Sequence, residues 1–213
     1  MGSLFITFEG TEGSGKSTQV KLLRRKLARR GVAAVLTAEP GGTPLSNRIR
    51  SLFKAQHPPP MVPLAELLLF NAARAQLVET VIKPSLAAGK VVICDRYTGS
   101  TLAYQGFGRC MDLDLVETAN RLATGGLQPD LVFLLDLPPG VGLQRKSDQR
   151  LDRFEREALE FHERVREGYL TLSRRDPQRW VILEAEQDPV ALSQSIWDRV
   201  QEALPVEVGC KGY

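Results

Sequence analysis

A glycine-rich segment near the start of the chain, Gly10 to Thr18, constrains the fold more than any other feature of the sequence. Gly10 to Ser17 fit the pattern G-x-x-x-x-G-K-[ST], in which backbone N–H groups, a lysine and a hydroxyl surround phosphate oxygens. The segment follows the apolar run 4–8 and precedes a helical pattern over 16–30. Because a strand before and a helix after give this pattern its specificity, the segment predicts a phosphate-binding loop. The alternative is a Gly- and Ser-rich turn that contains a lysine by chance.

The predicted loop would bind ATP as the phosphoryl donor. Lys16 would reach the β- and γ-phosphates, and the Ser17 hydroxyl would bind Mg²⁺. Glycines let successive N–H groups point at the phosphates, and the start of the following helix adds positive charge. The residues of this segment predicted to bind ATP are Gly10, Thr11, Glu12, Gly13, Ser14, Gly15, Lys16, Ser17 and Thr18.

Apolar runs typical of strands buried on both faces recur along the chain and alternate with helical patterns. This alternation predicts an α/β fold with a mainly parallel sheet, whose ligands bind at the carboxyl ends of the strands. We expect one domain over 1–205 and a disordered tail over 206–213. The apolar runs are 4–8, 32–36, 91–94, 131–135 and 180–183.

The composition of the chain limits the kinds of partner and compartment that we expect for it. A net charge of +3 from 28 basic and 25 acidic residues is too balanced for a surface that coats nucleic acid, so a small partner is expected. Cys94, Cys110 and Cys210 are odd in number and lack C-x-x-C spacing, which favours a reducing, cytoplasmic compartment. No apolar run approaches the ~20 residues that cross a bilayer, and the loop begins too early to leave room for a signal peptide.

Polar residues follow the second and third apolar runs. Glu39-Pro40 opens a loop that leads into a helix carrying Arg48 and Arg50. Asp95-Arg96 ends the third run, at the place where a nucleotide-hydrolysing or nucleotide-transferring enzyme presents an acid toward Mg²⁺. The arginine could bind a second phosphate. A structural ion pair is the alternative interpretation.

A possible base-binding face lies on the helical pattern 64–82, where Phe70 and Arg74 are four residues apart. An aromatic ring beside a guanidinium suits a nucleobase, although a phenylalanine such as Phe70, taken alone, more often belongs to the core. Further hydroxyl, amide and basic groups follow Asp95-Arg96 at helical spacing, namely Ser100, Thr101, Tyr104, Gln105 and Arg109.

Short segments that carry these groups are Phe8-Glu9-Gly10, Glu39-Pro40-Gly41-Gly42-Thr43, Ala72-Ala73-Arg74, Asp95-Arg96-Tyr97, Ala103-Tyr104-Gln105-Gly106 and Leu151-Asp152-Arg153-Phe154-Glu155. Together they resemble the thymidylate kinases over about residues 4–200. The resemblance implies a three-layer P-loop sandwich, a five-stranded parallel sheet flanked by helices, and a homodimer packed through helices. Where that family usually has an arginine before Glu-Pro-Gly-Gly-Thr, this chain has Ala38.

The resemblance also implies roles at the acceptor site. Phe70 would stack on thymine, Arg74 and Gln105 would bind its edge, and Tyr104 would crowd the 2′ position of the sugar. Glu12 would lie near the 3′-hydroxyl, and Ala185, Glu186 and Gln187 would form part of the adenine site. The implied substrate-binding set is Glu12, Glu39, Pro40, Arg48, Phe70, Arg74, Arg96, Ser100, Tyr104 and Gln105.

The loop positions Thr11, Glu12 and Ser14 carry no basic residue, so the cation that neutralises the transferring group must come from elsewhere. We expect it in a lid over about 144–153, for which a solvated basic turn is the alternative. The residues predicted to take part in catalysis are Lys16, Asp95, Arg96, Arg145, Arg150 and Arg153, with Ser17 and Asp95 at the metal. A structural role at the hinge of the lid is the alternative for Arg153, which precedes Phe154-Glu155.

The sequence therefore predicts ATP- and Mg²⁺-dependent phosphorylation of dTMP to dTDP. Another nucleoside-monophosphate or deoxynucleoside kinase is the nearest alternative, since only the acceptor pocket would differ. A nucleotide-binding module without turnover is the alternative from another class. A GTPase switch is disfavoured because the chain lacks an N-K-x-D segment.

Overall fold

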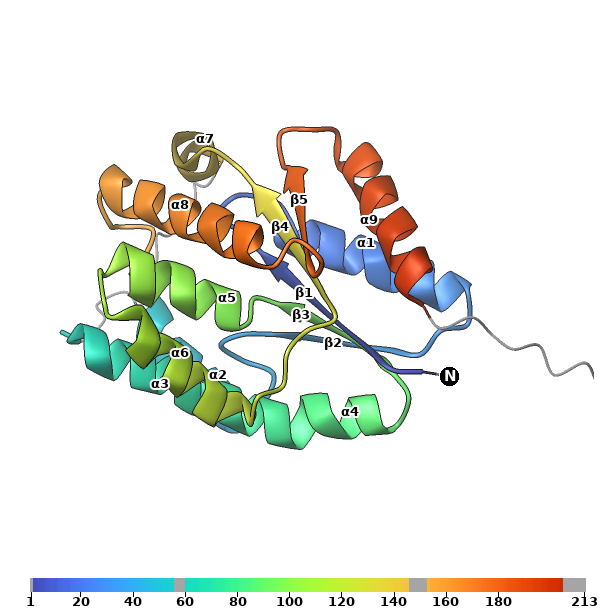
Figure 1. Cartoon of the computed structure of the whole chain (residues 1–213), viewed down its shortest axis with the longest axis horizontal. Helices are drawn as coiled ribbons and strands as arrows, with labels where there is room; N and C mark the ends of the chain where they lie inside the picture. Colours follow the sequence, from blue (N-terminus) through green and yellow to red (C-terminus); the bar gives the residue numbers. More distant parts are fainter. Residues whose placement is uncertain (1, 56–59, 146–152, 205–213) are drawn as a thin grey trace, which may run out of the picture.

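A parallel sheet forms the centre of the computed structural model, which describes residues 2–55, 60–145 and 153–204. Among these residues the strand order is β2-β3-β1-β4-β5, and every pairing is parallel. Helices cover both faces of the sheet, so the predicted three-layer α/β sandwich is confirmed (Figure 1). The strands are β1 (Leu4–Glu9), β2 (Ala34–Ala38), β3 (Val91–Asp95), β4 (Leu131–Asp136) and β5 (Trp180–Glu184).

Helical segments connect each strand to the next along the chain, as parallel pairing requires. The α-helices are α1 (Lys16–Arg29), α2 (Pro44–Lys54), α3 (Pro63–Leu77), α4 (Lys83–Ala87), α5 (Thr98–Thr101), α6 (Leu113–Thr124), α7 (Pro139–Gln144), α8 (Leu159–Arg175) and α9 (Pro189–Ala203). Two π-helical segments, η1 (Val78–Ile82) and η2 (Leu102–Gly108), continue α3 and α5. The helical pattern predicted over 64–82 therefore changes its winding near its end.

The core is built by the alternation of side chains along the strands. Ile6 and Phe8 of β1 face a cluster that includes Leu23 of α1 and Ile196 of α9. Phe5 points to the opposite face and packs in a cluster with α3 and η1. Helices on both sides thus bury β1 completely, and its carboxyl end carries the phosphate-binding loop in a fixed position.

The second strand begins two residues later than predicted. Val32 lies outside β2 because its N–H bonds Leu27 O and closes the end of α1. Gly31, at φ 70°, makes this turn and donates to Ala28 O. The apolar character of Val32 reflects its packing at the helix end rather than a place in the sheet.

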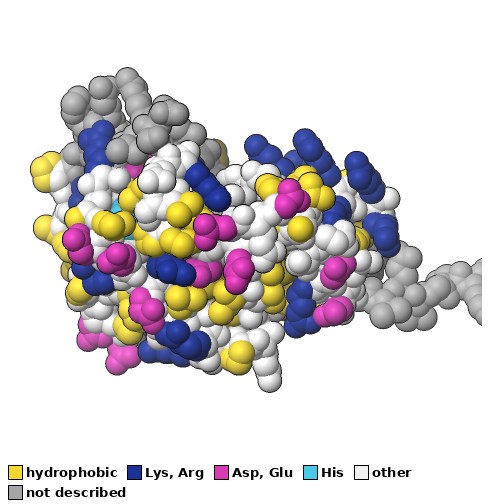
Figure 2. All heavy atoms as spheres, turned by 90° about the horizontal axis from the view of Figure 1, so that it is seen from above, with side chains coloured by type: hydrophobic (Ala, Val, Ile, Leu, Met, Phe, Trp, Pro, Cys, Tyr) yellow, Lys and Arg dark blue, Asp and Glu magenta, His cyan; other side chains and the backbone are white. Residues whose placement is uncertain are grey.

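The basic face of α1 is exposed, as expected for a solvated surface. Figure 2 shows Lys and Arg side chains gathered at the end of the molecule where α1 and α9 lie. Lys26 and Arg30 lie over the ring of Trp197, which ties this face to α9. In the described part of the chain, no helix combines the length and hydrophobicity needed to cross a membrane.

The predicted tail, 206–213, and most of the predicted lid, including Lys146 and Arg150, lie outside the described residues.

Candidate active site

A cavity of about 520 Å³ opens at the carboxyl ends of β1, β2 and β3. It extends from the phosphate-binding loop to the aromatic residues of α2 and α3. This is the edge at which ligands bind in open parallel sheets. The predicted site residues that line it are Glu12, Gly13, Ser14, Gly15, Lys16, Ser17, Thr18, Glu39, Pro40, Phe70, Arg74, Asp95, Arg96, Ser100, Tyr104, Gln105 and Arg145.

The loop takes a shape that only glycine permits at its tightest points. Gly13 has φ 71°, and a Cβ there would lie 2.3 Å from Gly142 O in α7. Gly10 has φ 136°, and its Cβ would meet Leu135 O at 2.5 Å. The loop is therefore clamped between the end of β4 and α7, which fixes the direction of its N–H groups.

Lys16 folds back on the loop. Its Nζ donates to Gly10 O (2.9 Å), Thr11 O (2.7 Å) and Ser14 Oγ (3.1 Å). Burial lowers the pKa of Lys16 to about 7, and the positive charge of Arg96 adds to this effect. An anion in the cavity would replace the carbonyl contacts and restore a higher pKa.

Ser17 and Asp95 meet at the opening of the cavity. Ser17 Oγ donates to Asp95 Oδ2 over 2.7 Å. A hydroxyl and a carboxylate beside a phosphate loop are the hard oxygen groups that suit Mg²⁺, which keeps several water and phosphate ligands. The described residues contain no cluster of three His, Cys, Asp or Glu side chains that could hold a metal by themselves.

Arg96 lies between the phosphate-binding loop and the aromatic end of the cavity. Its backbone has φ 74°, a strained value for a non-glycine residue, which directs the side chain across the loop. Nη1 donates to Gly10 O (3.0 Å), and Nη2 donates to Glu12 Oε1 and to the Tyr104 hydroxyl, both at 3.2 Å. The predicted phosphate-binding arginine is thus held in the middle of the cavity.

Glu12 is buried between Arg96, Tyr104 and His162. Tyr104 donates a short hydrogen bond to Glu12 Oε1, and His162 Nδ1 lies 3.5 Å from Oε2. Burial by itself would raise the pKa of Glu12, but the His162 contact and the charges of Arg96 and Lys16 hold it well below its usual range. Glu12 therefore brings a fixed negative charge to the centre of the site.

The opposite end of the cavity contains Arg74, which is 1% exposed. Arg74 Nε pairs with Glu39 Oε2 at 2.7 Å, while Nη1 and Nη2 donate to Asn120 Oδ1 and Tyr97 O. These contacts hold the guanidinium rigidly at the cavity wall. Burial raises the pKa of Glu39 to about 7, although the charge of Arg74 opposes the shift.

Aromatic rings form the wall beside Arg74. Phe70 is stacked on Phe53, with ring centres 4.3 Å apart and planes 9° apart. Phe154 lies 5.8 Å from Phe70 and edge-on to Tyr104 at 5.5 Å. Phe70, which is predicted to stack on a base, lines the cavity, and one of its faces is covered by Phe53, which was not among the predicted site residues.

The structure corrects the prediction for Arg48. Arg48 is exposed and does not line the cavity, whereas Arg50 does and donates from Nη1 to Pro40 O at 2.8 Å. The buried positions Ser46, Ile49 and Phe53 define the inner face of α2. Arg50 is four residues from Ser46 and falls beside that face, so helical phase could have identified it from the sequence.

The other predicted cations divide between the two ends of the site. Arg145 lines the cavity and donates to Gly13 O (3.2 Å) and Ala185 O (3.4 Å). Through its contact with Arg145, Ala185 lies beside the loop, while Glu186 and Gln187 are exposed and do not line the cavity.

Arg153 does not line the cavity either, because it pairs with the buried Glu66 at 3.1 Å. Arg150 lies outside the described residues.

Comparison with known proteins agrees with this geometry. The thymidylate kinase family model matches residues 8–196. A thymidylate kinase from Synechococcus sp. is 51% identical over 203 residues, covering 95% of this chain and 97% of that protein. The chain belongs to the thymidylate kinase family. Another member, from Dehalococcoides mccartyi, is 50% identical over 210 residues and covers 98% of this chain and 99% of its own length.

A solved structure gives the same result for the fold. The crystal structure of thymidylate kinase from Ehrlichia chaffeensis superposes with a TM-score of 0.76 and 36% identity, covering 94% of this chain and all of that one. The family predicted from the short segments of the sequence is confirmed. The region that the family model matches, residues 8–196, contains the phosphate-binding loop, Asp95-Arg96 and the wall formed by Phe70 and Arg74.

Proposed function

We infer that the chain transfers the γ-phosphoryl group of ATP to the 5′-phosphate of dTMP, with ADP and dTDP as products. The observation that carries this inference is a single cavity with a phosphate loop at one end and an aromatic and guanidinium wall at the other. Arg96 lies between the two ends. Membership of the thymidylate kinase family supports the same activity.

The donor end would hold the triphosphate of ATP. The loop N–H groups and Lys16 would bind the β- and γ-phosphates. Ser17 and Asp95 would hold Mg²⁺, which neutralises phosphate charge when it is bound. Arg145 already contacts the loop at Gly13 O, so it is placed to add positive charge to the transferring group.

The acceptor end would hold dTMP by its phosphate and base. The attacking oxygen belongs to a phosphate monoester with a second pKa near 6, so the reaction needs no strong general base. Arg96 and Arg50 would bind this phosphate, and Arg74 with Gln105 would read the base. Catalysis is then positioning and charge neutralisation, which can supply several kcal/mol of barrier lowering.

The test is an ADP-release assay with Mg-ATP and a panel of nucleoside monophosphates. Thymine presents O4 where cytosine presents an amino group, and Arg74 can only donate. Since an unpaired buried group costs roughly 1–3 kcal/mol, kcat/KM for dTMP should exceed that for dCMP by about one to two decades. Equal values for the two nucleotides, or ADP release that does not depend on any monophosphate, would refute the assignment.

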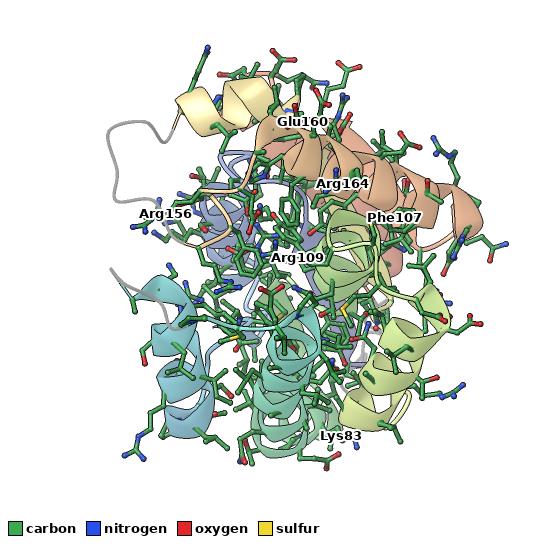
Figure 3. The ribbon with its side chains drawn as sticks, turned by 90° about the vertical axis from the view of Figure 1, so that its left-hand side faces the viewer. Lys83, Phe107, Arg109, Arg156, Glu160 and Arg164 are labelled. Carbon is green, nitrogen blue, oxygen red and sulfur yellow. The ribbon has the colours of Figure 1, made fainter. Side chains whose placement is uncertain are left out.

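We also propose a homodimer that works in the reducing cytoplasm. Exposed leucines on α2, α3 and α6, three helices that lie side by side in Figure 3, support self-association: Leu45, Leu52, Leu64, Leu68, Leu115 and Leu122. The free thiols of Cys94 and Cys110 suit a reducing compartment. Sedimentation of wild type and Leu68→Glu tests the dimer: the mass of the variant should halve, and two equal masses would exclude α3 from the interface.

A further inference from the structure

Glu66 is a buried acid of α3 that lies behind the base end of the cavity, the end formed by Phe70, Arg74 and Gln105. It is 1% exposed and does not line the cavity. Its Oε1 accepts a hydrogen bond from Gln105 Nε2 over 2.8 Å, and its Oε2 accepts one from Arg153 Nε over 3.1 Å. Arg109, labelled in Figure 3, donates to both oxygens at 3.2 and 3.3 Å. Glu66 therefore contacts a cavity residue, Gln105, without reaching the cavity itself.

The carboxylate of Glu66 fixes which end of the Gln105 amide faces the cavity. A carboxylate between two guanidinium groups can only accept hydrogen bonds, so it holds the NH₂ group of the amide. The carbonyl Oε1 of Gln105 is then the group left for a ligand. No hydrogen bond joins this oxygen to any other residue in the described ranges. Gln105 consequently presents an acceptor to whatever occupies the base end.

We propose that Glu66 is a positioning residue that sets the preference for thymine over cytosine through the direction of the Gln105 amide. Thymine carries an N3–H donor, which matches the Gln105 carbonyl, and an O4 acceptor, which matches an Arg74 N–H. Cytosine carries an acceptor at N3 and an amino donor at C4, so both pairings are lost. This proposal rests on the proposed function, since it requires a pyrimidine nucleotide at this end.

The arginine partners give Glu66 its rigidity. Arg153 Nη2 also donates to Met61 O (3.0 Å), and Arg109 Nη1 pairs with Glu157 at 2.7 Å. Each guanidinium is thus held by a second contact, and the carboxylate cannot turn away from Gln105 without breaking an ion pair. Replacing Glu66 by glutamine keeps the shape but allows either end of the Gln105 amide to face the cavity, because an amide can both donate and accept.

The test compares kcat/KM for dTMP, dUMP and dCMP in wild type and in Glu66→Gln. The dTMP to dCMP ratio should fall about tenfold, the effect of one hydrogen-bond pairing. The dTMP to dUMP ratio should stay within about twofold, because the two bases share the same hydrogen-bonding edge. Arg109→Gln is the matched control: it removes one ion pair of Glu66 but leaves the Arg153 pair and the Gln105 contact, so its dTMP to dCMP ratio should stay within about twofold of that of wild type.

If Glu66→Gln alone fails to fold, a double variant that restores the negative charge beside Arg109 and Arg153 keeps the proposal testable. In Glu66→Gln/Gln105→Glu the amide and the carboxylate exchange places, and the new carboxylate at position 105 again offers an acceptor to N3–H. This variant should keep the wild-type preference for dTMP over dCMP in equilibrium binding. A Glu66→Gln ratio equal to wild type, an equal loss in Arg109→Gln, or a double variant without preference would overturn the proposal. A wild type without preference for dTMP would instead overturn the proposed function.

Discussion

Arg48 and Arg50 differ by two positions on α2, and that difference decides which of them reaches the acceptor end. Arg50 lines the cavity, whereas Arg48 points to solvent. A charged hydrogen bond is worth about 1.5–3 kcal/mol, so Arg50→Ala should lower kcat/KM for dTMP by roughly ten- to hundredfold. Arg48→Ala should remain within about twofold of wild type. Steady-state kinetics of the pair would contradict this account if the two losses were equal.

Single residues were predicted best where a motif fixes the backbone. The loop residues and Asp95-Arg96 lie where the sequence pattern places them, because glycine geometry and the end of β3 leave little freedom. Phe53 was missed because its stacking on Phe70 joins two helices, and no local pattern encodes such a contact. Of the two roles predicted for Arg153, its pair with the buried Glu66 favours the structural one, although a basic residue in a polar segment gives no sign of such a partner.

At the scale of elements, helical spacing identifies the cavity residues of α5 and η2, but it does not reveal the π winding of η2. Arg109 N–H donates to Tyr104 O, five residues back, over 2.8 Å. Tyr104 and Gln105 of η2 line the cavity four residues after Ser100 and Thr101 of α5, so the predicted spacing holds although the winding changes. Such π-helical insertions recur at functional sites, but they have no reliable sequence pattern. The existence of the strands and of α1 was predictable, whereas the π winding of η2, which packs against α8, was not.

The contact between α7 and the phosphate loop offers a test at the same scale. A Cβ on Gly142 would lie 2.2 Å from Glu12 O, while a Cβ on Gly140 in the same helix would meet no atom within 4 Å. Gly142→Ala should therefore displace the loop and lower kcat/KM for ATP by about tenfold or more. Gly140→Ala serves as the control and should leave it unchanged. If the two variants had the same ATP kinetics, close packing of α7 would not hold the loop.

For the whole molecule, the buried Glu39 predicts an unusual dependence of stability on pH. Its folded pKa is about 7 and its ordinary value is 4.5, so between these values the folded state binds more protons than the unfolded state. Stability therefore falls as pH rises through this window, by roughly 3 kcal/mol for this group. Glu39→Gln should remove that contribution.

Urea unfolding of wild type and Glu39→Gln at pH 4.5 to 7.5 measures the difference. The wild type should lose stability relative to the variant as pH rises. A constant difference across the window would mean that the pKa of Glu39 is the same in the folded and unfolded states, and it would contradict the raised pKa.

For the chain as a whole, the proposed function requires that one cavity brings ATP and dTMP together for direct phosphoryl transfer. The measurement that tests it most directly is product analysis after incubation with [γ-³²P]ATP, Mg²⁺ and dTMP. Direct transfer should give labelled dTDP in equal amount to ADP, and Lys16→Ala should lose the label transfer while it keeps its fold. Label released as inorganic phosphate, or dTMP left unlabelled while ADP accumulates, would contradict it.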